Sequence, residues 1–170
     1  PVNTLLYVPY GKEVFAFTGH RPEKLTRPDR AIQKDLEKEI RQAIADGFSV
    51  FISGMARGVD IWAAEIVLRL RDAGEAIRLI CACPYQGFER GWKQSWQDRY
   101  KAILSTADLV RYICPGYSRS CFQQRNEWMV DHAARVIAVW NGSKSGTGNT
   151  VRYAMSSGKK VLIIDPNKLK

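Results

Sequence analysis

The chain has 170 residues, of which 45% are hydrophobic and 25% are charged, and it carries a formal net charge of +9. This length favours a single domain over residues 1–170, and the absence of an apolar run of about 18 residues argues against a membrane span. The positive charge suits a phosphate-bearing partner, but no block of like charge marks a nucleic-acid tail.

The cysteines indicate a reduced protein. Cys81 and Cys83 lie two residues apart in an apolar run that reads as a strand, so their side chains share a face in poor disulfide geometry. The sequence has neither two CxxC pairs nor a histidine partner for them, which argues against a metal site. The first residues also do not match a signal peptide, in which a basic region is followed by an apolar one. We therefore expect a cytoplasmic protein.

Short apolar runs alternate with amphipathic stretches along the whole chain. Residues 1–12 are expected to form an N-terminal arm or an edge strand. Hydrophobic periodicity, glycines and prolines then predict, in chain order, strand 14–18, helix 28–46, strand 49–52, helix 59–72, strand 77–82, helix 92–105, strand 108–112, helix 122–133, strand 135–140, helix 149–157 and strand 160–164.

This alternation predicts an α/β fold. Strands that are nearly continuous apolar runs are buried on both faces, as in parallel sheets. The right-handed crossover rule then gives a three-layer α/β/α Rossmann-like sandwich with a mainly parallel sheet of about six strands. Ligands of such sheets bind beyond the carboxyl ends of the strands, so the five loops there are the candidate sites.

The first two loops carry glycines and cationic groups. The first provides a glycine directly after the strand, and an arginine able to grip a phosphate or carboxylate with two hydrogen bonds; its candidates are Thr18, Gly19, His20 and Arg21. The second opens a helix whose free amides attract anions; its candidates are Ser53, Gly54, Arg57, Gly58 and Asp60. Asp60 could cap that helix, hold a ribose hydroxyl, or act as a weak catalytic candidate.

The third and fourth loops offer groups that could read a base. Pro84 begins the third loop, and Trp92 and Trp96 beyond it could stack on a base, although core packing is the favoured interpretation for both. Arg125 and Asn126 in the fourth could contact a phosphate and a base edge, or they could lie on a solvated helix face.

The fifth loop reads as a phosphate cradle before a helix. Its spacing is not that of a Walker A loop. The alternative is a flexible glycine- and serine-rich connection. The candidates here are Asn141, Gly142, Ser145, Gly146, Thr147 and Gly148.

The motifs resemble those of the SLOG superfamily. Residues 53–60 are similar to the SGxARGID motif of the Smf/DprA DNA-processing proteins, and residues 142–147 resemble the GGxGT segment of the LOG phosphoribohydrolases. Residues 18–21, 53–65 and 123–126 together resemble the YpsA-like branch. The resemblance spans residues 14–165 and implies a Rossmann-like fold with a pocket for a nucleotide-sugar or NAD-derived ligand, of the NAD or ADP-ribose type.

One departure from the LOG pattern bears on catalysis. Those enzymes carry a glutamate three residues after the glycine–threonine pair, where this chain has Thr150. A carboxylate is needed there to stabilise an oxocarbenium-like centre or to activate water. The first hypothesis is therefore that the protein binds or senses a small nucleotide-type ligand. The sequence indicates no metal and no definite cofactor.

Two other hypotheses stay open. One is a nucleotide-processing hydrolase, with Asp60, Glu65, His20 and Glu127 as acid–base candidates. The other is a single-stranded DNA-binding protein of the DprA type, favoured by the positive charge and the five tryptophans. A homo-oligomer built on exposed aromatics such as Trp92 and Trp128 is a further expectation.

Overall fold

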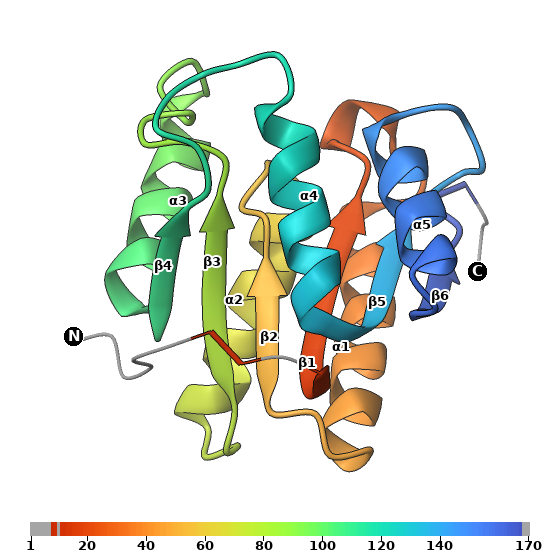
Figure 1. Ribbon diagram of the computed structural model, residues 1–170. Helices are drawn as coiled ribbons and strands as arrows, with labels where there is room; N and C mark the ends of the chain where they lie inside the picture. Colours follow the sequence, from red (N-terminus) through yellow and green to blue (C-terminus); the bar gives the residue numbers. More distant parts are fainter. Residues whose placement is uncertain (1–7, 10, 168–170) are drawn as a thin grey trace.

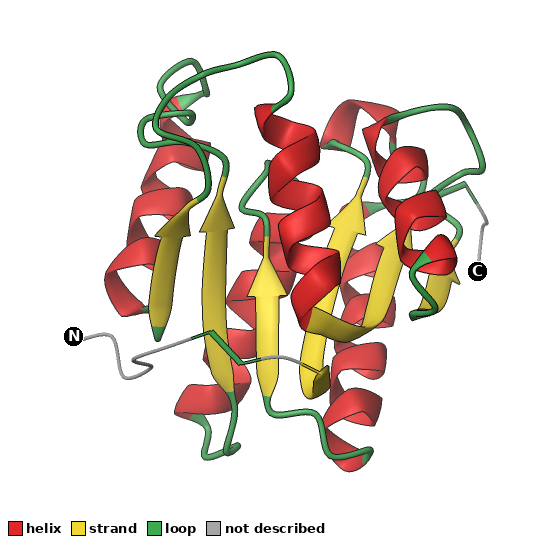
Figure 2. Cartoon of the chain, viewed as in Figure 1, coloured by secondary structure: helices red, strands yellow, loops and turns green. Residues whose placement is uncertain are grey.

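The computed structural model describes residues 8–9 and 11–167. They form one six-stranded sheet in the order β4-β3-β2-β1-β5-β6, and every recorded strand pair is parallel. The strands are β1 (Gly11–Gly19), β2 (Val50–Ser53), β3 (Arg78–Cys83), β4 (Leu109–Tyr112), β5 (Ala133–Val139) and β6 (Lys160–Ile164). In Figure 2 their arrows point toward one edge, which carries the loops that follow the strands.

Helices cover both faces of this sheet (Figure 1). On the near face of that view lie α4 (Cys121–His132) and α5 (Gly146–Ser156), and on the far face lie α1 (Asp29–Ala45), α2 (Val59–Asp72) and α3 (Gln94–Thr106). Each face has its own buried hydrophobic cluster. The prediction of a three-layer Rossmann-like sandwich is thus confirmed.

The order of the strands places a crevice between β1 and β5. The chain builds outward from β1 through β2 and β3 to β4, and then returns to lay β5 on the other side of β1. The loops after β1 and β5 therefore lead to helices on opposite faces of the sheet, α1 and α5, and diverge from each other. Open α/β sheets bind ligands at this kind of switch point.

Two predicted helix starts differ from the structure. Helix α3 begins at Gln94 rather than at residue 92, because Lys93 still has extended backbone angles. Helix α5 begins at Gly146 rather than at residue 149, because the Ser145 side chain accepts a hydrogen bond from the amide of Gly148 and caps the helix earlier. The glycines of the predicted fifth loop therefore lie partly in the first turn of a helix.

The N-terminal expectation can be compared with the structure only in part. Gly11 and Lys12 belong to β1, and Gly11 pairs with Ala133 of β5. Residues 8 and 9 have no regular structure. Residues 1–7 and 10 lie outside the described residues.

The tryptophans expected to be exposed are half-buried. Trp92 packs edge-to-face on Phe88 and Tyr100, and Trp128 lies against His132 with ring centroids 4.1 Å apart. Both side chains are thus less exposed than expected, and the dimer face itself stays a prediction. All four cysteines are buried free thiols, and within residues 8–9 and 11–167 no helix is long and apolar enough to cross a membrane.

A buried carboxylate ties β3 to the neighbouring elements. Asp108 lies just before β4; it accepts a 2.8 Å hydrogen bond from the amide of Leu79 and forms a 2.9 Å ion pair with Arg71 of α2. Its side chain is only 4% exposed. Removing Asp108 leaves the buried amide of Leu79 without its acceptor and Arg71 without its buried carboxylate partner, although Arg71 keeps its contacts with Asp72 and the carbonyl of Thr106.

We predict that Asp108→Ala lowers the free energy of unfolding by about 3 kcal/mol, measured by urea denaturation. The matched control is Asp72→Ala, since Asp72 also pairs with Arg71 but is 70% exposed, and its loss is expected to stay below about 1 kcal/mol. Equal losses in the two variants would contradict the structural role of Asp108.

Candidate functional site

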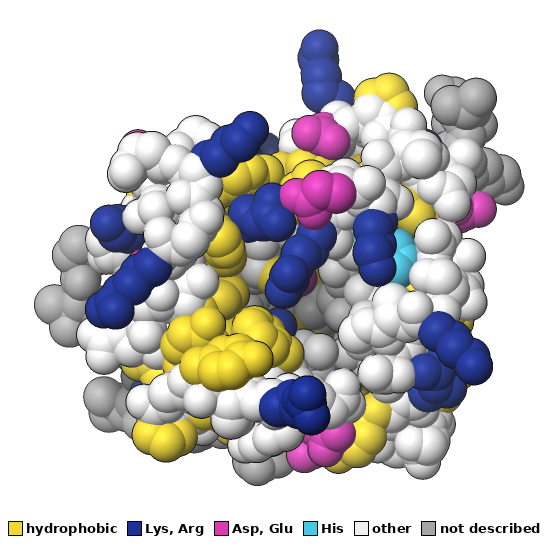
Figure 3. Space-filling view, turned by 90° about the horizontal axis from the view of Figure 1, so that it is seen from above, with side chains coloured by type: hydrophobic (Ala, Val, Ile, Leu, Met, Phe, Trp, Pro, Cys, Tyr) yellow, Lys and Arg dark blue, Asp and Glu magenta, His cyan; other side chains and the backbone are white. Residues whose placement is uncertain are grey.

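A cleft of about 420 Å³ opens at the carboxyl ends of the strands. It is lined by residues from the loops after β1, β2 and β5 and from the first turns of α2, α4 and α5: Thr18, Gly19, His20, Arg21, Glu23, Lys24, Ala56, Arg57, Asp60, Phe122, Arg125, Asn126, Ser145, Gly146 and Thr147. Figure 3 looks onto this edge and shows Lys and Arg side chains gathered around a hollow. The volume suits a small polar ligand.

The start of α5 presents free backbone amides to the cleft. The first amides of a helix have no partner within the helix, and the Ser145 side chain satisfies only that of Gly148, at 3.0 Å. Gly146 and Thr147 line the cleft, and their amides have no recorded acceptor in the described part of the chain. A Cβ added at Gly146 would meet nothing within 4 Å, so this helix start is open to an anion.

The loop before α5 is held in place by hydrogen bonds. Nε2 of His20 lies 2.9 Å from Oδ1 of Asn141, and the same Oδ1 accepts a hydrogen bond from the amide of Ser143. The indole of Trp140 donates to the carbonyl of Ser143 at 2.8 Å. Desolvation by burial lowers the pKa of His20, so the imidazole is neutral at pH 7 and fixes the loop without adding charge.

The loop after β2 bends back onto its own helix. Met55 has φ 63°, a conformation that side chains other than glycine rarely adopt, and its amide donates to the Ser53 hydroxyl. The amide of Ala56 then donates to Oδ2 of Asp60 at 3.2 Å. Asp60 therefore braces the turn through one carboxylate oxygen.

The second oxygen of Asp60 is buried without a hydrogen-bond partner among the described residues. Asp60 is 6% exposed and lines the cleft. Burial raises its pKa to about 6, against the opposing effect of the nearby guanidinium of Arg125. A carboxylate with an unsatisfied oxygen suits a hydroxyl donor better than a phosphate, which it would repel.

Arg125 forms part of the cleft floor. Its guanidinium donates to the carbonyl of Gly54, and its Nε donates to Oδ1 of Asn126 at 2.8 Å. A Cβ at Gly54 would lie 3.0 Å both from the Arg125 guanidinium and from Oδ2 of Asp60. A side chain at position 54 would therefore displace the Arg125 guanidinium and the Asp60 carboxylate by a few tenths of an ångström, which glycine avoids.

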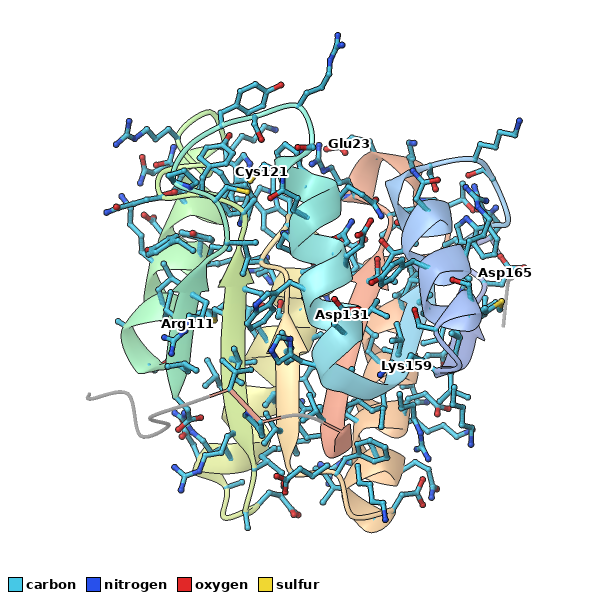
Figure 4. All side chains as sticks on the ribbon, viewed as in Figure 1. Glu23, Arg111, Cys121, Asp131, Lys159 and Asp165 are labelled. Atoms are coloured by element: carbon cyan, nitrogen blue, oxygen red, sulfur yellow. The ribbon has the colours of Figure 1, made fainter. Side chains whose placement is uncertain are left out.

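The lining carries an excess of positive charge. Arg21, Lys24, Arg57 and Arg125 face two carboxylates, and one of these, Glu23, is paired with Arg57 at 2.5 Å. Figure 4 labels Glu23 at the upper end of the molecule in that view, whereas Asp131 and Lys159 lie lower. The excess of two positive charges matches a phosphate monoester or a diphosphate.

The predicted site residues divide into two groups. The structure brings eleven of them to the cleft: Thr18, Gly19, His20, Arg21, Arg57, Asp60, Arg125, Asn126, Ser145, Gly146 and Thr147. The other seven do not line it: Ser53, Gly54, Gly58, Pro84, Asn141, Gly142 and Gly148. Gly58, for example, has φ +91° and packs on Pro22.

Four lining residues were not among the sequence candidates: Glu23, Lys24, Ala56 and Phe122. Lys24 and Glu23 follow Arg21 in the same loop, so extending that candidate by one turn would have found them. Phe122 opens α4 one turn before Arg125, a helical spacing that was readable in the sequence. Among the described residues, no cluster of His, Cys, Asp and Glu could hold a metal ion.

Solved structures share this architecture. DNA processing protein A (DprA) from Helicobacter pylori superposes with a TM-score of 0.66 at 22% identity, covering 96% of this chain and 68% of that one. DprA from Streptococcus pneumoniae gives a TM-score of 0.64 at 21% identity, covering 92% of this chain. The chain spans only half the length of the latter structure. These structures therefore share the Rossmann-like fold of this chain.

The family is defined by sequence. A profile described as the YspA SLOG family (YpsA) matches residues 15–168, and the chain belongs to this family. A UPF0398 protein of Bacillus thuringiensis (strain Al Hakam) is 30% identical over 157 residues, which cover 87% of this chain and 83% of the relative. The prophage-derived protein YoqJ of Bacillus subtilis (strain 168) is 35% identical over 116 residues, 61% of this chain and 68% of YoqJ. The resemblance to the YpsA-like branch is confirmed.

The raised pKa of Asp60 predicts a pH-dependent stability. The folded chain binds this proton up to about pH 6, whereas the ordinary value is 3.8, so the stability associated with the group is full below pH 3.8 and is lost as the pH rises to 6. Asp60→Asn removes this dependence. The free energy of unfolding of the variant, relative to wild type, should therefore rise by roughly 3 kcal/mol between pH 4 and pH 7.

Urea denaturation at both pH values measures this difference, and Asp98→Asn, which removes an exposed carboxylate on α3, is the control. If the difference in free energy of unfolding between Asp60→Asn and wild type stays constant from pH 4 to pH 7, burial does not raise the pKa of Asp60.

Proposed function

We propose that the cleft binds a nucleotide or a nucleotide-derived phosphate ligand, and that the protein acts by binding rather than by hydrolysis. The observation that carries the proposal is the convergence of the open α5 helix start with the cationic groups of three other segments on one cleft. A helix start alone is a weak indication of a site. The second and independent one is Asp60, which lines the same cleft and has one buried carboxylate oxygen without a hydrogen-bond partner among the described residues.

The arrangement assigns separate tasks to its two ends. The amides of Gly146 and Thr147 would donate hydrogen bonds to the phosphate, and Arg21, which also lines the cleft, would neutralise it. Asp60 would accept a hydrogen bond from a sugar hydroxyl. A ligand of the ADP or ADP-ribose type, with both groups, would satisfy both ends, whereas inorganic phosphate would leave Asp60 unsatisfied.

Binding is favoured over glycoside hydrolysis by the position of Thr150. This residue stands where the LOG enzymes carry their glutamate, and it is 3% exposed. Its hydroxyl donates to the carbonyl of Gly146 at 3.0 Å, within its own helix. Of the acid–base candidates, only Asp60 and His20 line the cleft, while Glu65 pairs with Arg99 and Glu127 accepts from Gln123.

We predict that Gly146→Val weakens the affinity for ADP at least tenfold, because Gly146 lines the cleft and a branched side chain there would take up space beside the first amides of the helix. Isothermal titration calorimetry with ADP measures the change. Gly91→Val is the matched control, since its Cβ also meets open space but the residue is not part of the cleft lining. ADP binding equally tight to wild type and Gly146→Val would exclude this helix start as the phosphate site.

Single-stranded DNA is a second candidate ligand. The Helicobacter pylori neighbour has been described through its mode of binding single-stranded DNA, and the net charge of +9 favours a polyanion. The same cleft could hold one phosphate of a strand. The likeness to that neighbour shows a common fold only. Its binding of single-stranded DNA is therefore not assigned to this chain on that basis.

If single-stranded DNA is the ligand, the affinity for an oligothymidylate should fall about tenfold or more between 50 mM and 200 mM salt, because several counterions are released on binding. Fluorescence anisotropy measures this dependence, and ADP should compete with the strand for the cleft. Binding that is insensitive to salt, or that ADP does not reduce, would remove this candidate.

A further inference from the structure

A group of aromatic side chains lies beside the cleft. Tyr85 packs edge-to-face on Phe88, Tyr117 and Phe122, with ring centroids 5.9, 5.9 and 6.2 Å away. These residues come from the loop after β3, the loop after β4 and the first turn of α4. We refer to Tyr85, Tyr117 and Phe122 as the aromatic platform. Phe88 supports it from below, because it also packs on the core residue Tyr100.

The platform is continuous with the cleft. Phe122 is one of the lining residues, and Arg125 and Asn126 follow it one turn later on α4. Figure 3 shows hydrophobic side chains gathered on one side of the hollow, next to the Lys and Arg side chains. A ligand whose phosphate lies at α5 could therefore extend along the cleft onto aromatic rings.

The loops beneath the platform are fastened to one another. The carbonyl of Pro84 accepts a hydrogen bond from the amide of Cys114 at 2.9 Å and one from the Cys121 thiol at 3.0 Å. This single carbonyl joins the loops after β3 and β4 to the start of α4. The segments that carry the rings are therefore held by the scaffold, which limits the backbone entropy that is lost when the rings bind a ligand.

The platform is also open to solvent. Tyr117 is 71% exposed, and Tyr85 and Phe122 are each partly exposed. Aromatic side chains that are rigidly held, partly exposed and next to a cationic cleft are the combination that stacks on bases, because every base offers a flat π-face and carries a phosphate nearby. Such stacking contributes about 1–3 kcal/mol per base.

We propose that the aromatic platform is a base subsite, and that the ligand of this protein is a nucleobase-bearing phosphate rather than a phosphorylated sugar alone. This inference rests on the proposed function, since it assumes that the phosphate occupies the cleft. The base would stack on the exposed rings, and Asn126, which lines the cleft one turn after Phe122 on α4, would be available to its edge. A free nucleotide and a base within a single strand share this chemistry.

The test compares two ligands that differ only in the base. Wild-type protein should bind AMP at least tenfold more tightly than ribose 5-phosphate, measured by calorimetry. Tyr117→Ala and Tyr85→Ala should each reduce the affinity for AMP at least fivefold and leave that for ribose 5-phosphate unchanged. Tyr117→Trp should retain AMP binding, and Tyr112→Ala is the matched control, since Tyr112 is 43% exposed but lies on β4 outside the platform.

A short oligothymidylate separates the two sources of the base. Tighter binding of the strand than of AMP, lost in Tyr117→Ala, would identify the base as part of a strand; the reverse order would identify a free nucleotide. Equal affinities for AMP and ribose 5-phosphate, or equal losses of both in the platform variants, would overturn the base subsite while leaving the phosphate site intact. Binding of none of these ligands would instead contradict the proposed function itself.

Discussion

The candidate site depends on the burial of one guanidinium group. Arg125 enters from α4, is 5% exposed, and donates to the carbonyl of Gly54 at the end of β2. A buried arginine is costly unless its hydrogen bonds are satisfied, so this contact fixes the distance between α4 and the loop after β2. The same group lies near Asp60 and opposes the rise in its pKa. Arg125 thus contributes positive charge to the floor of the cleft and also limits the rise in the pKa of the Asp60 carboxyl group.

The cleft therefore combines two chemically different kinds of group. One end has helix amides and mobile cations at the rim, and the other has a carboxyl group that lacks one hydrogen bond. Both ends favour a ligand that is anionic at one point and has hydroxyls at another. The cleft does not provide a close carboxylate pair, because Glu23, the other acidic lining residue, is paired with Arg57 at the rim. The geometry therefore favours recognition over glycoside hydrolysis.

The sequence was sufficient for the fold and for most of the residues that line the cleft, whose role as a site stays a prediction. Alternating apolar and amphipathic runs predicted the parallel sheet, and the rule that ligands bind at the carboxyl ends of strands selected the loops that meet at the cleft. The sequence could not distinguish a solvated Arg125 from a buried one, since both occupy the same helical position. That distinction depends on the missing side chain of Gly54, which is distant in sequence.

Other differences have similarly local causes. Helix α5 begins at Gly146, earlier than predicted, because the Ser145 side chain caps the helix there. The prediction had assigned these glycines to the preceding loop. Pro84 was a candidate contact, and the structure places it beneath the aromatic platform, where its carbonyl joins two loops and a helix. The platform itself was not predicted, because Tyr85, Tyr117 and Phe122 come from three separate segments that only the folded chain brings together.

The most direct test of the account follows the backbone amides themselves. A ¹⁵N-labelled sample titrated with ADP should show its largest amide shifts at Gly146 and Thr147, with further changes at Arg21 and at the Nε–H of Arg125. The rival surface is the basic groove between α1 and α2, of about 650 Å³, which includes Arg30, Lys34, Lys38, Arg41 and Arg69. Shifts confined to that groove, with Gly146 and Thr147 unmoved, would contradict the claim that the open helix start holds the phosphate.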